Sequence, residues 1–420
     1  MSDLLVVHGP ARPRRIAIAR LLLACTVMLC LAATESSGQK PPGFDSAWRD
    51  IASWYHSTLS EQGVAGSAVW FFANGQTAAR EFHGFADLES QRRVDENTIF
   101  HWASITKTFT GIAIMQLRDR GRLDLDDPLI KYLPELRAVN DTFGPIDRIT
   151  IRHAMSHTAG FRAGTWPWGG DEPWHPHEPT EWAQIVAMLP YTEILFEPGS
   201  RSSYSNPAII FLGRIVEILS GDDFEVYVDK NILKPLGMHE SYFDVTPYHL
   251  LRNRSNNYVV RDGKLVAQGL DFDTGITTSN SGLNAPITDM SRYLGFLAGH
   301  APDGPARNVL SRTSLDEMWT AQIGLTPDTA RTSTRDSMGL IFFLIENGGR
   351  HYVGHTGSQK SFLSFFYVDP AAGTAAIAAF NTTAAGSGQR PETGTILAGL
   401  RARLFDSVFP LWPVTALAPR

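Results

Sequence analysis

The segment HWASITKTFTGIAIMQL, residues 101–117, constrains the fold more than any other part of the chain. From 109 to 117 only Thr110 and Gln116 interrupt a run of small and apolar residues. A helix that is apolar on most of its faces is buried. Lys107 stands at the start of this run, and burying an unpaired ammonium is costly and usually lowers its pKa. We therefore expect an internal helix whose lysine either reaches the surface or has a chemical role.

The size and charge of the chain limit the classes of protein it can belong to. Its 420 residues exceed the roughly 250–300 that one core can serve, so two lobes or domains are expected. The formal net charge is −6, and the body of the chain contains no basic run. This balance argues against nucleic acid as a partner.

The N-terminal segment has the layout of a secretory signal. Four arginines between residues 12 and 20 precede the apolar run LLLACTVMLCLAA (21–33), and a polar linker follows at 34–43. The apolar run is too short to span a bilayer comfortably. We expect a signal peptide at 1–33 and an exported protein, periplasmic or secreted, with a lipoprotein anchor at Cys25 as the alternative. Both cysteines lie in this leader, so the mature chain lacks cysteine chemistry.

Periodic patterns predict the main elements. A first helix is expected from residue 44, a hairpin at 67–87 with an Asn74-Gly75 turn, and the internal helix up to Gly121. Short helices and loops follow from Asp124 to about Ala285. Strands return at about 338–381, and a closing helix is expected at about 393–409.

The fold class follows from this order. Terminal hairpins that each leave an edge and an apolar face are expected to join in one antiparallel sheet. The prediction is an α/β (α+β) domain over 44–410, in which an antiparallel sheet is flanked by helices. Its α/β lobe comprises about 44–118 and 290–410, its mainly helical lobe about 119–289, and a cleft between them is the expected place for a site.

Ser104 and Lys107 form the first chemical motif. Three residues apart on a helix, their side chains lie on the same face. A serine hydroxyl is a poor nucleophile until a base takes its proton, and a lysine is such a base only when neutral. Burial can lower a lysine pKa by up to 3–5 units, into the useful range. The spacing alone is weak, because Ser37 and Lys40 share it in the polar linker, where no helix is expected.

Two further motifs complete the candidate site. In SSYSNPA, the phenol of Tyr204 can share proton transfer if a nearby ammonium lowers its pKa, and Asn206 can position a carbonyl or the lysine. YVGHTGS contributes its own group at the end of a strand: His355, Thr356, Gly357 and Ser358. There the glycine permits close approach of a ligand, and the N–H of the last serine can pair with that of the nucleophile as an oxyanion hole.

These three motifs in order resemble the serine β-lactamase and penicillin-binding-protein superfamily. The Tyr-x-Asn form is similar to its class C-like branch, which includes class C β-lactamases, D-alanyl-D-alanine carboxypeptidases, D-aminopeptidases, family VIII esterases and LACTB-like proteases. The resemblance covers about residues 45–405 and extends to MSHTAGF (155–161), FEPGSRSSYSN (196–206), YVDKNILKPLGM (227–238) and GLNAPITDMSRY (282–293).

The resemblance implies acyl transfer through a covalent Ser104 intermediate, without a cofactor or metal. Lys107 and Tyr204 would share acid–base work, and Asn206 would orient the substrate. The departure is His355, where class C β-lactamases carry lysine. A ring that is mostly neutral at pH 7 attracts a substrate carboxylate less and repels Lys107 less. We therefore expect Lys107 to depend on desolvation and β-lactam hydrolysis to be inefficient.

Other patterns are interpreted conservatively. His153 and His157 stand four apart, but the glutamate and third ligand of a zinc protease motif are missing, so both are interpreted as structural. The isolated pair His175 and His177 is likewise not expected to bind metal. Four tryptophans (Trp166, Trp168, Trp174 and Trp182) form either a lid over the cleft or part of the core.

The leading expectation is a serine hydrolase of the esterase or D-amino-acid peptidase type, acting on a small ester, amide or peptide. A β-lactamase or D-alanyl-D-alanine carboxypeptidase is the nearest alternative. An alternative of another class is a non-catalytic β-lactam sensor or scaffold. The sequence fixes neither the natural substrate nor the oligomeric state, because substrate choice resides in loop geometry.

Overall fold

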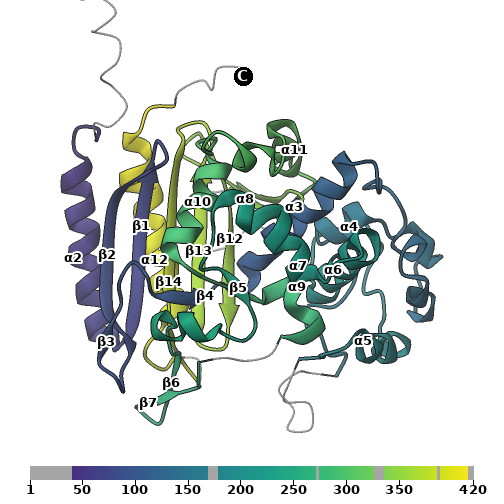
Figure 1. The fold of residues 1–420 in the computed structure, drawn as a ribbon, viewed down its shortest axis with the longest axis horizontal. Coiled ribbons are helices and arrows are strands. Elements are labelled where there is room, and N and C mark those ends of the chain that lie inside the picture. Colours follow the sequence, from purple (N-terminus) through teal and green to yellow (C-terminus); the bar gives the residue numbers. More distant parts are fainter. Residues whose placement is uncertain (1–39, 169–177, 271–273, 326–334, 386–387, 415–420) are drawn as a thin grey trace, which may run out of the picture. The chain divides into compact units, whose positions relative to one another are not determined.

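A nine-stranded antiparallel sheet forms the centre of the fold, with the strand order β3-β2-β1-β14-β13-β12-β11-β10-β9. Figure 1 labels the part of this sheet that runs from β3 to β12. This computed structural model describes residues 40–168, 178–270, 274–325, 335–385 and 388–414. The sheet strands are β1 Gly66–Ala73, β2 Gln76–Asp87, β3 Arg92–Arg93, β9 Ile323–Gly324, β10 Arg335–Met338, β11 Phe343–Asn347, β12 Arg350–Gln359, β13 Phe362–Asp369 and β14 Thr374–Phe380. Because β1 pairs with β14, the prediction that the terminal hairpins join is confirmed.

Two helices from opposite ends of the chain cover one face of this sheet, α2 Phe44–Gln62 and α12 Thr393–Arg403 (Figure 1). The buried residues of α2 have the predicted helical spacing: Phe44, Trp48, Ile51, Tyr55 and Leu59. Phe71 of β1 joins the two ends, with ring-centroid distances of 5.8 Å to Phe44, 5.0 Å to Phe409 and 6.2 Å to Trp412. An aromatic cluster thus covers this face of the sheet and packs it against the two terminal helices.

The opposite face packs on α3 Thr106–Asp119, α10 Ile287–Leu297 and α11 Arg312–Met318. Every residue of α3 from Thr106 to Leu117 is buried, so the predicted internal helix is confirmed. The helix is preceded by a short 3₁₀ turn, Ala103–Ile105. Ser104 therefore lies in this 3₁₀ turn, before the first residue of α3, and not in the first turn of the α-helix as predicted.

The middle of the chain contains strands as well as helices. Its helices are α4 Ile151–Met155, α5 Trp182–Met188, α6 Asn206–Ser220, α7 Phe224–Val228, α8 Lys234–Leu236 and α9 Thr278–Ser281. Two small sheets were not predicted. One is β15-β6-β7 (Thr382–Ala384, Tyr258–Arg261, Lys264–Ala267), and the other is β4-β8-β5 (Ile99–His101, Leu283–Pro286, Tyr242–Phe243). The lobe boundaries stay predictions. Within the described ranges, no helix is both long enough and apolar enough to cross a membrane.

Replacing Phe71 with alanine should destabilise the fold strongly, because its ring is fully buried between the two terminal helices. A buried Phe→Ala change typically costs about 3–5 kcal/mol of unfolding free energy. Chemical denaturation of Phe71→Ala measures this, with Tyr248→Ala as the control because Tyr248 is 91% exposed. A loss below about 1 kcal/mol would contradict the role given to the cluster.

Candidate active site

The turn that carries Ser104 is fixed from several directions. The preceding residue, Trp102, donates its backbone N–H to Leu283 O (2.9 Å) and its indole N–H to Ala285 O (2.9 Å), which ties the turn to β8. Ala103 adopts a φ of 48°, a conformation that is costly for a residue with a side chain. Ser104 is thereby held at the N-terminal end of α3, where free N–H groups and the helix dipole favour negative charge.

Lys107 is fully buried beside this serine. Its Nζ lies 3.1 Å from Ser104 Oγ and donates to the backbone carbonyl of Asn280 at 2.8 Å. In the described part of the chain it forms no ion pair, and burial lowers its pKa well below the ordinary value, against the opposing charge of Glu178. An amine in this state has a lone pair available for the serine proton. Of the two alternatives for Lys107, the surface exit is excluded.

The Asn280 carbonyl was not foreseen. It belongs to α9, which packs against α3, and the neighbouring carbonyl of Ser279 accepts a hydrogen bond from Thr110 Oγ1 at 2.5 Å. Two consecutive carbonyls at this short helix thus hold two residues of α3. A backbone oxygen has no sequence signature, so only the fold could identify this contact.

Tyr204 places its ring against the lysine, with Lys107 Nζ 4.9 Å from the ring centroid. It precedes Ser205, the N-cap of α6, whose hydroxyl accepts the Ala208 N–H. The Tyr204 hydroxyl is buried and has no hydrogen-bond partner of ordinary geometry among the described residues. Burial raises its pKa, while the nearby Ser104 side chain opposes the rise. The expectation that an ammonium lowers this pKa is therefore wrong, because burial of the phenol is the largest influence on it and raises the pKa of Tyr204.

Asn206 is the first residue of α6, and its backbone N–H donates to Ala163 O at 3.0 Å. Its side-chain Oδ1 is buried and makes no hydrogen bond to any described residue. An amide with an unused acceptor is suited to a substrate N–H or to an ammonium. The structure gives no direct bond between this amide and Lys107. The other expected partner, a substrate carbonyl, requires the Nδ2 donor of the amide and not the unused Oδ1.

His355 lies inside β12, not at the end of a strand, and is fully buried. Its Nδ1 donates to Thr356 O (2.6 Å), which leaves Nε2 as a bare acceptor, buried and without a partner in the described ranges. Burial, and secondarily Lys107, lower the pKa of His355 to about 3. Its ring is 6.3 Å from Tyr204. With a pKa of about 3 the ring is neutral at pH 7, whereas only a mostly neutral ring was expected from the ordinary histidine pKa.

The rest of the His355 motif runs beside the nucleophile turn. β11 pairs with β12 only as far as Gly354, so the segment beyond is free of β11. A side chain at Gly357 would meet the Trp102 carbonyl at 2.2 Å, so only glycine allows the strand this close to the turn. The sequence predicted that this glycine lets a ligand approach; the close approach that the structure shows is to the backbone of Trp102, two residues before Ser104. Thr356 is half-buried and Ser358 is exposed on the same strand.

His157 was interpreted as structural, but its ring packs 4.5 Å from that of Tyr204. His153, its suggested metal partner, instead accepts the Thr150 N–H at 3.3 Å and caps α4. The described residues contain no cluster of metal-ligating side chains, and His175, His177 and Trp174 lie outside them. Trp182 contacts Phe211 at 6.2 Å and, with Trp166, packs on the main core, whereas Trp168 is 39% exposed.

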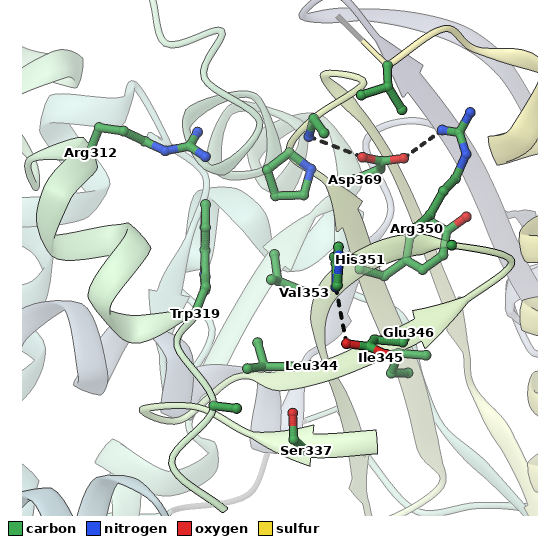
Figure 2. A pocket seen from close by; sticks show the side chains of 16 residues that line it. Arg312, Trp319, Ser337, Leu344, Ile345, Glu346, Arg350, His351, Val353 and Asp369 are labelled. Atoms are coloured by element: carbon green, nitrogen blue, oxygen red, sulfur yellow. Dashed lines mark hydrogen bonds and ion pairs between the residues drawn. The ribbon is translucent and has the colours of Figure 1, made fainter. Parts of the chain in front are cut away.

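A separate cavity of about 560 Å³ lies along β11 and β12, beside Trp319 (Figure 2). Its charged side chains are paired with one another or with neighbours. Arg350 contacts Asp369 at 2.7 Å and His351 contacts Glu346 at 3.6 Å (Figure 2), while Arg312 binds Asp316 at 2.7 Å. None of the candidate catalytic residues lines this cavity.

Removing the buried amine of Lys107 should make the folded protein more stable. Unfolded Lys107 is protonated up to about pH 10.4, whereas its folded pKa is lower, so the unfolded state binds more protons and stability rises with pH between these values. Lys107→Met should therefore raise the melting temperature at pH 7, with a gain that shrinks toward pH 10. Turnover should fall by about 10²–10⁴, the contribution of a general base.

Thermal melts from pH 6 to 10 test this. Lys264→Met is the control, because Lys264 lies on the exposed strand β7. A Lys107→Met protein less stable than the parent at every pH would show that the amine is not a desolvated charge site.

Comparisons with known proteins identify the family of the chain. Residues 45–400 match the Beta-lactamase family. Esterase EstB of Burkholderia gladioli is 30% identical over 212 residues, 46% of this chain and 53% of the esterase. A β-lactamase of Pseudomonas fluorescens is 30% identical over 188 residues, 44% of this chain and 48% of that protein. These matched segments span about half the length of the curated relatives.

A solved structure extends the likeness to the fold. The octameric penicillin-binding protein homologue from Pyrococcus abyssi superposes with a TM-score of 0.68 and 25% identity, over 83% of this chain and 77% of that chain. The family match itself includes both the sheet strands of the N-terminal half and those of the C-terminal half. The chain therefore belongs to the Beta-lactamase family.

Proposed function

We propose that the protein is a serine hydrolase that cleaves an ester or amide bond through a covalent Ser104 acyl-enzyme. The observation that carries this proposal is the 3.1 Å contact between Ser104 Oγ and a fully buried Lys107 Nζ. A serine beside an amine that burial keeps neutral is an activated nucleophile. This pair sits at the N-terminal end of a helix, where negative charge on the developing tetrahedral intermediate is favoured.

In the proposed acylation step, Lys107 Nζ takes the proton of Ser104 as Oγ attacks the carbonyl carbon. Tyr204, a neutral phenol beside the new ammonium, donates its proton to the leaving alcohol or amine and regains one from Lys107. In deacylation, water takes the place of Ser104 as the nucleophile and Ser104 Oγ is the leaving group that receives the proton. The carboxylic acid is released and the hydroxyl of Ser104 is restored. Both groups begin and end the cycle neutral.

The remaining predicted residues serve substrate binding in this proposal. The N–H groups of Ser104 and Ser358 would hold the oxyanion, and losing such a donor costs roughly 10²–10³ in rate. The unused Oδ1 of Asn206 would accept a substrate N–H. His355, Thr356 and Gly357 would form the wall along β12, with the bare Nε2 of His355 as an acceptor.

The charge state of the site favours substrates without a carboxylate at this wall. His355 has a pKa of about 3 and brings no positive charge to it. An uncharged acyl ester or a D-amino-acid amide or peptide therefore fits better than a carboxylate-bearing β-lactam or D-alanyl-D-alanine peptide, which stay the alternatives. The name of the similar esterase, EstB, supports the ester. No cofactor is needed for this chemistry.

We also infer export, from the arginines, apolar run and linker at residues 1–43. Mass spectrometry of the mature N-terminus distinguishes a leader that is cleaved, a chain that is lipidated at Cys25 and a leader that is retained. The proposed partner is a small molecule and not a nucleic acid.

Ser104→Ala should abolish both turnover of a short-chain p-nitrophenyl ester and covalent labelling by a fluorophosphonate. Ser37→Ala is the matched control, since Ser37 and Lys40 have the same spacing in the linker, and it should keep full activity. The parent should release a burst of p-nitrophenol followed by steady turnover. A burst without turnover would indicate the sensor alternative, and full labelling of Ser104→Ala would refute the assignment.

The acidic limb of the kcat/KM profile should belong to Lys107. Its neutral form is the base, so kcat/KM falls as the pH falls through its lowered pKa. His355, with a pKa of about 3, should not contribute to a limb above pH 5. The limb should therefore keep its position in His355→Gln, whatever that change does to the absolute rate. A limb that disappears in His355→Gln would assign it to the histidine instead.

A further inference from the structure

His157 makes three contacts with Tyr204 and its two neighbours in the chain. Its backbone carbonyl accepts the N–H of Ser203 at 2.8 Å, and its ring Nδ1 accepts the N–H of Ser205 at 3.2 Å. Its ring lies against the ring of Tyr204, with centroids 4.5 Å apart and planes 31° apart. One residue thus binds the chain on both sides of Tyr204 and packs on the tyrosine itself.

The conformation of His157 is specific to this arrangement. Its φ of 56° is in the left-handed region, which is unusual for a residue with a side chain. The residue is buried, with 1% of its surface exposed. Strain and burial together show that the surrounding fold, and not local preference, holds the ring in place.

The hydrogen bonds also define the state of the ring. Nδ1 accepts a backbone N–H, so the ring is neutral and its proton is on Nε2. That Nε2 is buried and has no partner among the described residues. Burial is the largest cause that lowers the pKa of His157, which lies well below the ordinary value. The ring therefore stays a hydrogen-bond acceptor toward Ser205 at any pH near neutrality.

We propose that His157 is a positioning residue for Tyr204: it fixes the phenol in the place from which a proton is passed between Lys107 and the leaving group. This inference rests on the proposed function. The need for such a residue follows from Tyr204 itself, whose hydroxyl makes no hydrogen bond of ordinary geometry to a described residue and has only the side chain of Ser104, the reacting group itself, acting on its pKa. Proton transfer requires donor and acceptor to lie within about 2.6–3.2 Å, so a displaced ring loses the step.

Two substitutions separate the ring from the backbone conformation. Glycine adopts a φ of 56° without strain, so His157→Gly removes only the side chain. Asparagine also tolerates this region, and its Oδ1 can replace Nδ1 as the acceptor for the Ser205 N–H. His153→Asn is the matched control, because His153 likewise accepts a backbone N–H, that of Thr150, but contacts α4 and not Tyr204.

With the short-chain ester, His157→Gly should lower kcat by roughly 10- to 100-fold with little change in KM, the scale of a misplaced catalytic group. His157→Asn should recover most of this loss, and His153→Asn should keep the parent kcat. A double-mutant cycle then assigns the effect. If His157 acts through Tyr204, His157→Gly should cost nothing further in a Tyr204→Phe background.

Multiplicative losses in that double mutant, or a kcat loss that His157→Asn does not reduce, would overturn the proposal. Equal kcat in His157→Gly and the parent would also overturn it. The melting temperature of each variant shows whether a loss of kcat comes from unfolding. If His157→Gly is unfolded, the kcat of the folded His157→Asn variant decides whether His157 positions Tyr204. Failure of the proposed function is seen separately: fluorophosphonate labelling of His157→Gly at Ser104 should persist, whereas Ser104→Ala should not be labelled.

Discussion

The desolvation of Lys107 is the interaction on which the rest of the site depends. A lysine in water is charged at neutral pH and cannot accept a proton from a serine. Here the amine is enclosed because α3 is buried along nearly its whole length between the sheet and the helices of the middle segment. The partners of Nζ are a hydroxyl and a carbonyl, which orient the amine without stabilising its charge as a carboxylate would. The fold itself therefore supplies the neutral amine that the proposed mechanism uses as its base.

The same enclosure keeps the neighbouring groups neutral. His157 and His355 have lowered pKa values, and Tyr204 has a raised one, with burial as the largest cause in each case. Each of the three also has a buried polar atom without a partner in the described residues. Such atoms are costly in a folded protein, at about 1–3 kcal/mol each, and are expected where a substrate or water completes the bonds. The site thus gives up stability for unsatisfied hydrogen-bonding capacity, as functional sites commonly do.

Local sequence patterns predicted most helices and strands, whereas the contacts of the site could be identified only from the folded structure. The spacing of Phe44 to Leu59 and the Asn74-Gly75 turn each encode their element within a few residues, and both predictions were confirmed. The hairpin of β6 and β7 was missed although its turn is Asp262-Gly263, an equally direct signal within a segment taken to be helical. Asn280 and His157 could not be assigned, because a carbonyl has no side-chain signature and a histidine's role depends on the chain it meets.

The position of Gly357 shows how closely the sheet and the nucleophile are linked. β12 reaches the turn before Ser104 only because Gly357 lacks a side chain where the Trp102 carbonyl would stand 2.2 Å away. β12 is itself held by β13, which pairs through β14 to β1, from the opposite end of the chain. The site therefore cannot form within any one segment: Ser104 lies in the 3₁₀ turn before α3, Tyr204 just before the N-cap of α6, and His355 in β12. A contact of such long sequence separation forms slowly, because loop closure must precede the contacts that stabilise it. Catalytic competence should accordingly be acquired with the complete sheet, and not with the α3 helix alone.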